Sequence, residues 1–339
     1  MYVKRLKLYG VKGFRLDLPK GGESDLAQAT RKRMLLQGGN GSGKTTVLGT
    51  IPELWRMFGQ MIDETSTSFR FPENSRWHGE LNAMELGDFP TAGHSFWIAV
   101  GNANGIEDLR KANPDAPIAS MVVARHRSHI ELPSGDWRTI KTRSQEGVEP
   151  LPNVVYFPPE GRSLVKVPRD PVRRLDLYDY NWLAQFDSDF DFDSLLFTMR
   201  ALHPERYEAA IALFNLMLKP TGKRVASLEY GHGRLEIERI EEPRPPSHSW
   251  IALSSGERQM LLLVIYTVCL LRENSILIID EPDLHIHIAM VTQLMETLER
   301  TARERKGQLI VASHSQLVWD WFARDEERIQ LGPWRGEPE

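Results

Sequence analysis

A glycine-rich turn followed by lysine and threonine is the part of the chain whose residue types and spacing predict chemistry most directly. Gly38, Gly43, Lys44 and Thr45 fit the pattern G-x-x-x-x-G-K-[ST]. An apolar strand, RMLLQ, precedes the turn and a helix, TTVLGTIPELWRMF, follows it. Main-chain N–H groups of the turn and the positive end of the helix then converge on one point. This arrangement predicts a binding site for a nucleoside triphosphate, and a glycine-rich turn that binds nothing is disfavoured because both flanking elements agree.

The predicted phosphate-binding residues are contiguous: Gly38, Gly39, Asn40, Gly41, Ser42, Gly43, Lys44, Thr45 and Thr46. Lys44 is expected to reach the β and γ phosphates of ATP. Thr45 is expected to place its hydroxyl on Mg²⁺, and Thr46 lies one residue deeper in the helix.

Two adjacent carboxylates near the other end of the chain supply the groups that such a site needs for hydrolysis. The segment NSILIIDEPDLHIH (274–287) reads as a buried strand of a parallel sheet that ends in Asp280 and Glu281. Its carboxyl end is expected beside the glycine-rich turn. Asp280 is then placed to hold Mg²⁺ through water, and Glu281 to orient and deprotonate the attacking water.

Two further segments carry groups suited to phosphate. In IALSSGERQMLLL (251–263), Ser254, Ser255 and Gly256 begin an apolar helix with Glu257 in its first turn, so that exposed N–H groups form an anion site. GQLIVASHSQ (307–316) is a strand ending in His314, whose imidazole is suited to bond a γ phosphate. Taken singly, the serines are most often a helix cap and the histidine is most often structural, so the order of the segments carries the prediction.

That order resembles the ABC-type ATPases, and within them the SMC, RecF and OLD-type branch. The residues that carry the resemblance are YGVKGFRLDL (9–18), GGNGSGKTT, LSSGERQ, LIIDEPDLHIH and VASHS, and it covers about residues 1–55 and 150–331. It implies that Ser254, Ser255, Gly256 and Glu257, called the signature below, bind the γ phosphate of ATP held by a second copy. Two ATP molecules would be sandwiched in a head-to-tail homodimer that ATP closes and hydrolysis opens.

The chain departs from the family pattern at the glutamine loop. The best candidate, VVYFPPEGRSL (154–164), offers Glu160 in place of glutamine, and Glu160 is the predicted Mg²⁺ or water contact. The form DEPDLHIH matches the OLD-like branch and places Asp283 at the dimer seam, with His285 and His287 interpreted as supporting or interface residues. Arg15 either approaches the nucleotide, as in the SMC group, or is an exposed strand arginine.

The predicted fold class is α/β: a P-loop core with a mostly parallel sheet, an inserted antiparallel β subdomain, and a helical and hairpin lobe that carries the signature. The expected divisions are 1–59 (P-loop half), 60–150 (inserted subdomain), 151–175 (return to the core), 176–250 (lobe) and 251–339 (signature, Asp-Glu strand and switch histidine). DWRTIKTR (136–143) reads as one of the β runs, residues 194–219 as one or two helices interrupted near Pro204, and residues 187–193 as an acidic loop that caps the next helix.

Composition limits the partners. With 42 Lys and Arg against 46 Asp and Glu, the net charge of −4 argues against a protein that coats nucleic acid through its overall charge. A basic cluster from Arg125 to Arg174 has two interpretations. It either contacts the phosphate backbone of duplex DNA or forms a solvated face with salt bridges. The longest apolar run, around Cys269, spans 12 residues, which is too short for a membrane, so a cytoplasmic protein without a membrane partner is expected.

The resulting hypothesis is Mg²⁺-dependent ATP hydrolysis by a sandwich dimer that switches a DNA-associated or effector complex in DNA repair or anti-phage defence. Because about 25 residues follow His314, no nuclease domain fits there, and a separate effector or nuclease protein is expected. The alternatives are a nucleotide-binding subunit of a membrane transporter, which the missing glutamine loop disfavours, and a slow ATP-sensing switch.

Overall fold

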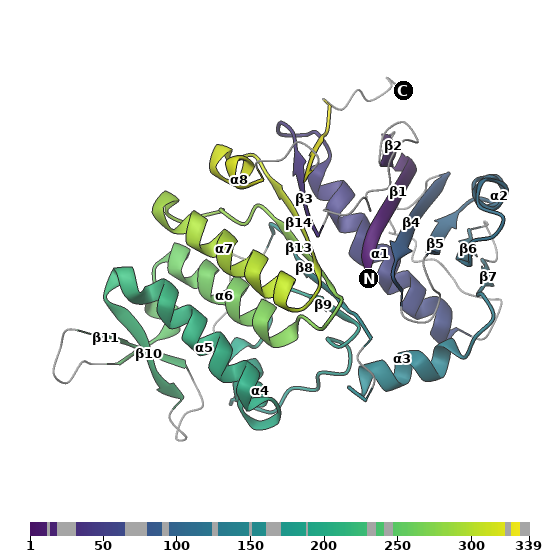
Figure 1. The fold of residues 1–339 in the computed structure, drawn as a ribbon. Coiled ribbons are helices and arrows are strands. Elements are labelled where there is room, and N and C mark those ends of the chain that lie inside the picture. The colour runs from purple at the N-terminus through teal and green to yellow at the C-terminus, as the bar shows by residue number, and fades with distance from the viewer. Residues whose placement is uncertain are drawn as a thin grey trace.

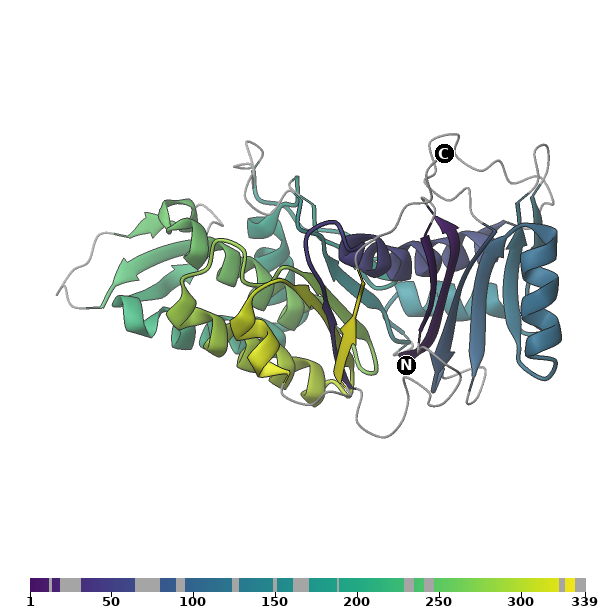
Figure 2. The same cartoon turned by 90° about the horizontal axis from the view of Figure 1, so that it is seen from above.

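Two six-stranded sheets and one three-stranded sheet organise the chain in the computed structural model (Figure 1). The structure describes residues 1–11, 14–18, 32–64, 80–89, 95–123, 128–148, 151–160, 171–187, 189–228, 235–240, 247–322 and 327–332. Figure 2 shows the three sheets side by side. The six-stranded sheet that contains the N-terminal strands, called the second sheet, lies at one end, and the three-stranded sheet lies at the other end. The other six-stranded sheet lies between them and is called the central sheet.

The central sheet is parallel throughout. Its strands, in spatial order, are β15 (Arg328–Gln330), β3 (Arg33–Gln37), β14 (Gln308–Ser313), β13 (Ile276–Asp280), β8 (Val154–Phe157) and β9 (Leu183–Gln185). Every residue of β13 and β14 is buried, as expected for strands covered on both faces. The predicted strands before the glycine-rich turn, before Asp280 and before His314 are therefore confirmed.

Helices cover both faces of this sheet, and β13 shows how the sequence divides between them. Ile276 and Ile278 pack into the core that contains α1 (Lys44–Asp63). Leu277 and Ile279 pack into the core formed with α6 (Ser255–Leu270) and α7 (Ile288–Glu304). Successive side chains of a strand point to opposite faces, so one apolar run supplies both cores. The short α8 (Gln316–Trp321) follows β14 and packs beside α7.

The second sheet combines the N-terminal strands with the segment after α1. Its order is β2 (Phe14–Leu18), β1 (Tyr2–Val11), β4 (Leu81–Gly87), β5 (Phe96–Gly101), β6 (Ile118–Val122) and β7 (His129–Glu131). The pairs are antiparallel except β5 with β6, which α2 (Ala103–Ala112) connects as a parallel crossover. The strands after α1 thus extend an N-terminal hairpin, and α1 lies between the two large sheets (Figure 2).

The prediction of a β run at residues 136–143 is wrong, because the chain forms α3 (Trp137–Gln145) there. Asp136 caps this helix by accepting a hydrogen bond from the N–H of Thr139 at 3.3 Å. Trp137, Lys141 and Ser144 are buried at helical spacing, and Trp137 stacks on Phe89 and packs against Phe58 and Phe96. Tertiary packing of the tryptophan therefore overrides the β propensity of the segment.

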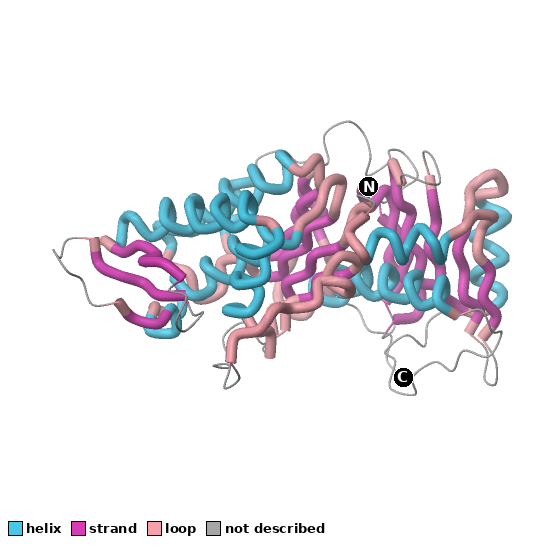
Figure 3. The backbone as a smooth tube through the Cα atoms, turned by 90° about the horizontal axis from the view of Figure 1, so that it is seen from below, coloured by secondary structure: helices cyan, strands magenta, loops and turns pink. Residues whose placement is uncertain are grey.

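The lobe follows the central strand β9 and lies beyond α6 and α7. It contains α4 (Phe192–Leu202), α5 (Pro204–Leu218), the 3-10 turns η2 (Lys219–Thr221) and η3 (Trp250–Ala252), and the strands β10 (Lys223–Leu228), β11 (Leu235–Arg239) and β12 (His248–Ser249). The helix break at Pro204 and the cap that Asp191 forms on α4 are as predicted. Figure 3 shows the three strands at the edge of the molecule, away from the two large sheets.

Candidate functional site

The glycine-rich turn between β3 and α1 has the geometry that its glycines allow. Gly41 and Gly43 lie in the left-handed region, with φ of 76° and 88°, where L side chains are strained. A Cβ on Gly38 would lie 2.5 Å from the Oγ of Ser42. The turn therefore depends on glycine at these positions, in the order that the motif predicts.

Main-chain and side-chain donors of this turn fit a phosphate group. Gly43 begins α1 without any side-chain cap, so the first N–H groups of the helix keep their donor capacity. The Oγ of Ser42 is buried and has no hydrogen-bond partner within the described part of the chain. Lys44 is 7% exposed and curls over the turn, with Nζ donating to the carbonyls of Gly38 at 2.9 Å and Gly39 at 3.2 Å. Thr45 is exposed on the same helix end.

The register of the central sheet places the Asp-Glu pair beside this turn. Ala312 of β14 pairs with Leu36 of β3 on one side and with Asp280 of β13 on the other. Two strand spacings separate the last residues of β3 and β13, which is about 10 Å. Asp280 is fully buried at this edge. The structure thus brings together the glycine-rich turn and the carboxylates, as predicted from motifs more than two hundred residues apart in the chain.

No group of three or more His, Cys, Asp or Glu side chains is arranged to hold a metal ion among the described residues. Mg²⁺ keeps several waters and is bound through one or two carboxylates together with substrate phosphates. Asp280 and the exposed Thr45 fit that sparse donor set. Glu160 is exposed three residues beyond the end of β8. The strand β8 borders β13 on the side away from β3.

Glu281 and His314 contact each other directly. Nδ1 of His314 lies 2.8 Å from Oε2 of Glu281, which is within ion-pair distance. Glu281 has a φ of 54°, and its N–H is fixed by the carbonyl of Ala312 at 2.7 Å. The hydrogen bond and the charge of Glu281 raise the pKa of His314, Asp283 adds to the rise, and burial and Lys44 oppose it. The predicted base and the predicted phosphate sensor therefore form one pair at the sheet edge.

The loop from Glu281 to His287 is held by β14 and by α6. The hydroxyl of Ser313 donates to the carboxylate of Asp283 at 2.8 Å and accepts from the N–H of Ser315 at 2.9 Å. A Cβ on Gly256 would lie 2.8 Å from the carbonyl oxygen of His285, so the loop contacts the first turn of α6. His287 caps α7 through Nδ1, which accepts from the N–H of Ala289 at 3.3 Å.

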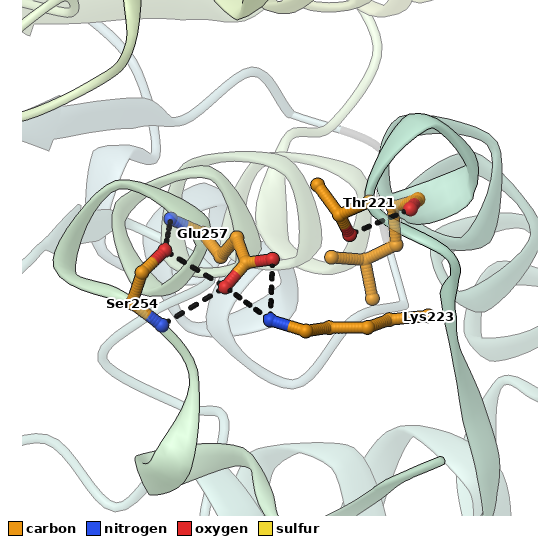
Figure 4. Close-up of polar contacts among 5 residues, drawn as sticks. Thr221, Lys223, Ser254 and Glu257 are labelled. Carbon is orange, nitrogen blue, oxygen red and sulfur yellow. Dashed lines mark hydrogen bonds and ion pairs between the residues drawn. The ribbon is translucent and has the colours of Figure 1, made fainter. Parts of the chain in front are cut away.

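The signature forms a reciprocal cap at the start of α6 (Figure 4). Oε2 of Glu257 accepts from the N–H of Ser254 at 2.9 Å and from its hydroxyl at 2.7 Å. The N–H of Glu257 donates back to Oγ of Ser254 at 3.4 Å. Nζ of Lys223 in β10 donates to both carboxylate oxygens, at 2.8 and 2.9 Å. Ser254 and Ser255 are exposed, while Glu257 is buried.

Glu257 gives a pH dependence to the stability of this region. Burial alone would raise its pKa, but the hydrogen bonds from Lys223 and Ser254 outweigh burial and lower the pKa below the ordinary value of 4.5. A lowered folded-state pKa stabilises the fold above the unfolded-state pKa, and that contribution is lost as the pH falls through the folded-state pKa. We expect Glu257→Gln to lower the free energy of unfolding on the order of 2 kcal/mol at neutral pH.

The measurement for Glu257 is denaturant unfolding of the two proteins across a pH series. The difference in the free energy of unfolding between wild type and Glu257→Gln should be constant above pH 4.5 and should become smaller below it. A difference that grows on acidification would contradict the lowered pKa. Glu296→Gln, at an exposed position of α7, is the matched control.

The basic cluster is only partly available to a ligand. Lys141 is buried, and its Nζ donates to the carbonyl of Gly59 at 3.0 Å and to Asp63. Together with Arg138, which donates to the carbonyl of Asp63 at 2.6 Å, it fastens α3 to the end of α1. Including Lys141 among DNA contacts is therefore wrong. Of the remaining members, those outside the described residues are Arg125, Arg127, Arg162, Lys166 and Arg169, and those exposed are Arg138, Arg143, Arg173 and Arg174.

Arg15 is exposed on β2, and its guanidinium lies 4.8 Å from the ring centroid of Tyr9 on the paired strand. This contact fits the exposed strand arginine of the two interpretations. Within the part of the chain that is described, every helix is too short or too polar to cross a membrane.

A family model and a curated relative each match part of the chain. The family described as "AAA domain, putative AbiEii toxin, Type IV TA system" matches residues 174–320, which is less than half of the chain. Protein ea59 of Escherichia phage lambda is 31% identical over 68 residues, and this match spans 20% of the chain and 13% of the length of ea59.

Two solved structures are similar over almost the whole chain. The SMC head bound to the C-winged helix domain of ScpA is 15% identical, with a TM-score of 0.54 over 94% of this chain and 92% of that chain. The SMC head domain from Thermotoga maritima is 14% identical, with a TM-score of 0.47 over the same shares of the two chains.

Residues 174–320 match an AAA-domain family, and the glycine-rich turn has the geometry of a P-loop. Over most of its length, the chain has a fold similar to that of an SMC head.

Proposed function

We propose that this protein hydrolyses ATP to ADP and phosphate with Mg²⁺, and that two copies sandwich the nucleotides between them. The observation that carries the proposal is the meeting of Lys44, Asp280, Glu281 and His314 at one edge of the central sheet. Lys44 binds the β and γ phosphates, and Thr45 with Asp280 holds Mg²⁺, which offsets charge on the phosphates. Glu160 is the proposed additional water or metal contact.

Glu281 is the proposed general base. Its carboxylate accepts a proton from the attacking water as the new P–O bond forms and the bond to ADP breaks. His314 holds one carboxylate oxygen, and its exposed imidazole is the group placed to bond the γ phosphate. The barrier is lowered mainly by positioning and by fixed charge around the phosphates.

The exposure of the signature supports the dimer. Because α1 and α6 cover opposite faces of the central sheet, a two-fold pairing lets the signature of one copy close the glycine-rich turn of the other. Thr45, Ser254 and Ser255 are exposed, as a shared site requires. Ile288, beside the exposed His287, is 63% exposed and is the most exposed large apolar side chain that the structure describes. An apolar residue at the rim of the site suits an interface between copies.

A separate effector is the proposed output of the dimer. The description of the matching family names a toxin of a toxin–antitoxin system, and the similar SMC head is bound to a domain of another protein. Both support a role in which ATP-driven closure is read by a partner in defence or DNA repair. Duplex DNA is the proposed input, through the exposed Arg143, Arg173 and Arg174.

A slow ATP-sensing switch is the second candidate, and the Glu281–His314 contact favours it. A carboxylate whose charge is partly offset by a neighbouring imidazole is a weaker proton acceptor. The two candidates separate by turnover, since the common range for enzymes begins at about 1 per second.

Steady-state ATP hydrolysis with and without linear duplex DNA, at low salt, tests the proposal. Stimulation that is lost when Arg143, Arg173 and Arg174 are all replaced by alanine would support DNA as the input. The matched control is alanine at Arg303, an exposed arginine of α7. Equal rates with and without DNA would contradict DNA as the input, and an absence of hydrolysis under both conditions would contradict the proposed activity.

A further inference from the structure

Lys223 connects the lobe to the signature. It is the first residue of β10, and its Nζ reaches a carboxylate 34 residues further along the chain, at the start of α6. Both oxygens of Glu257 accept from this one ammonium group, at 2.8 and 2.9 Å. The Lys223 side chain is 28% exposed and that of Glu257 is 5% exposed, so water weakens this pair less than it would a surface pair.

The main chain around Lys223 is fixed to α5. In the turn before it, the hydroxyl of Thr221 donates to the carbonyl of Leu218 at 2.8 Å (Figure 4). Gly222 makes the bend with a φ of 68°, and the N–H of Val225 donates to the side chain of Asn215 at 2.7 Å. Because this turn is held by hydrogen bonds, a displacement of β10 relative to α6 would move the Lys223 ammonium group together with the lobe.

Glu257 links Lys223 to Ser254 through a shared hydrogen-bond acceptor. The same carboxylate oxygen, Oε2, accepts from Lys223 and from both the N–H and the hydroxyl of Ser254. The orientation of the hydroxyl is set by this oxygen, because a hydroxyl that donates to it has only its lone pairs left for other partners. Two residues on, Gly256 lies against the carbonyl of His285, so the first turn of α6 has little freedom to adjust elsewhere.

We propose that Lys223 is a positioning residue for the signature, through which the lobe sets the rate of hydrolysis of the ATP held by the other copy. This inference rests on the proposed function, in which the signature acts across the dimer. It adds that the lobe controls the site without touching nucleotide.

The lobe strands are the part of this arrangement that an effector can reach. The three-stranded sheet lies at the edge of the molecule (Figure 1). Its strand β10 begins with Lys223, which contacts Glu257 in the first turn of α6. A protein bound to this sheet would act on the signature through the Lys223–Glu257 pair.

The test uses mixed dimers in which one site alone turns over. A Glu281→Gln subunit binds ATP without hydrolysing it but supplies an intact signature. Mixed in excess with a catalytically intact subunit, it leaves hydrolysis to the intact subunit's site, which is closed by the signature of the Glu281→Gln copy. Lys223→Met is then introduced into one subunit or the other.

We expect Lys223→Met to lower turnover about tenfold when it lies on the Glu281→Gln subunit, and to leave turnover unchanged when it lies on the intact subunit. ATP binding by the separate subunits should not change, because Lys223 contacts Glu257 and not the glycine-rich turn. Lys223→Arg should restore most of the rate, since it keeps a donor for the carboxylate. Arg224→Met is the matched control, because Arg224 pairs with Glu238 within the hairpin.

Three results would overturn the inference. An equal loss in both arrangements would mean that Lys223 merely stabilises the fold, and no loss in either would mean that the pair does not position the signature. A loss confined to the intact subunit would place the signature in the same chain as its nucleotide. That last pattern would overturn the proposed sandwich itself and is therefore distinct from the first two.

Discussion

Replacing Glu281 by glutamine is expected to lower ATP turnover by about 10²–10⁴-fold while ATP binding is retained. Glutamine has nearly the same shape, and its amide oxygen is an acceptor that His314 can still face, since Nδ1 lies 2.8 Å from the Glu281 carboxylate. The change removes the ability to accept a proton from water. It leaves Lys44, Thr45 and the buried Asp280 in place, so the affinity for MgATP should remain.

The same variant is expected to accumulate as a dimer when ATP is present. If ATP favours the closed dimer and hydrolysis releases it, blocking hydrolysis shifts the population to the closed state. Size-exclusion chromatography with multi-angle light scattering, with ATP and with ADP, measures this directly. A Glu281→Gln protein that hydrolyses at the wild-type rate would remove Glu281 as the base, and one that stays monomeric with ATP would contradict the sandwich. Glu296→Gln is the control for loss of a carboxylate elsewhere.

Segments with a strong local signal were predictable from the sequence. The apolar runs before Gly38, Asp280 and His314 form β3, β13 and β14 with the expected ends, because a fully buried parallel strand is recognisable as a run of β-branched and aliphatic residues. Ser254 caps α6 and Asp191 caps α4 for the same reason. A short polar side chain just before an apolar periodic segment satisfies N–H groups that have no helical partner.

Contacts between distant segments were not predictable. The strand β1 at the N-terminus pairs with β4, which follows α1 in the sequence. No pattern within either strand specifies the partner strand. Lys223 carries no motif, and its role follows from the approach of β10 to α6. The hydrogen bond from Ser313 to Asp283 is also a contact between distant segments, and its sequence signal is the position of Ser313 directly before the switch histidine in VASHS.

His314 shows where a motif predicts a residue but not its contact. Its place at the end of β14 is as predicted, and its side chain is 57% exposed. In the structure Nδ1 of the imidazole lies 2.8 Å from Oε2 of Glu281. Base and sensor are therefore coupled, and a change at either residue alters the other.

Replacing Ser255 by arginine is expected to lower the rate of ATP hydrolysis on the order of 10²–10³-fold and to leave ATP binding by the monomer unchanged. Ser255 is exposed at the first position of α6, and Ser254, not Ser255, forms the helix cap. An arginine there should not disturb the fold, because the reciprocal cap with Glu257 remains. It would fill the space that the γ phosphate of the other copy's ATP needs beside the signature, so the sandwich cannot close.

Nucleotide binding and turnover must be measured on the same preparation to separate these effects. Asn104→Arg is the matched control, since it adds the same charge to an exposed position in the first turn of α2. Ser254→Ala provides the complementary case: it removes the cap without adding bulk and should cost about 1 kcal/mol of stability. If Ser255→Arg also lost ATP binding, the signature would belong to the site of its own chain. Because α1 and α6 lie on opposite faces of the central sheet, retained binding with lost turnover is the outcome that a shared site predicts.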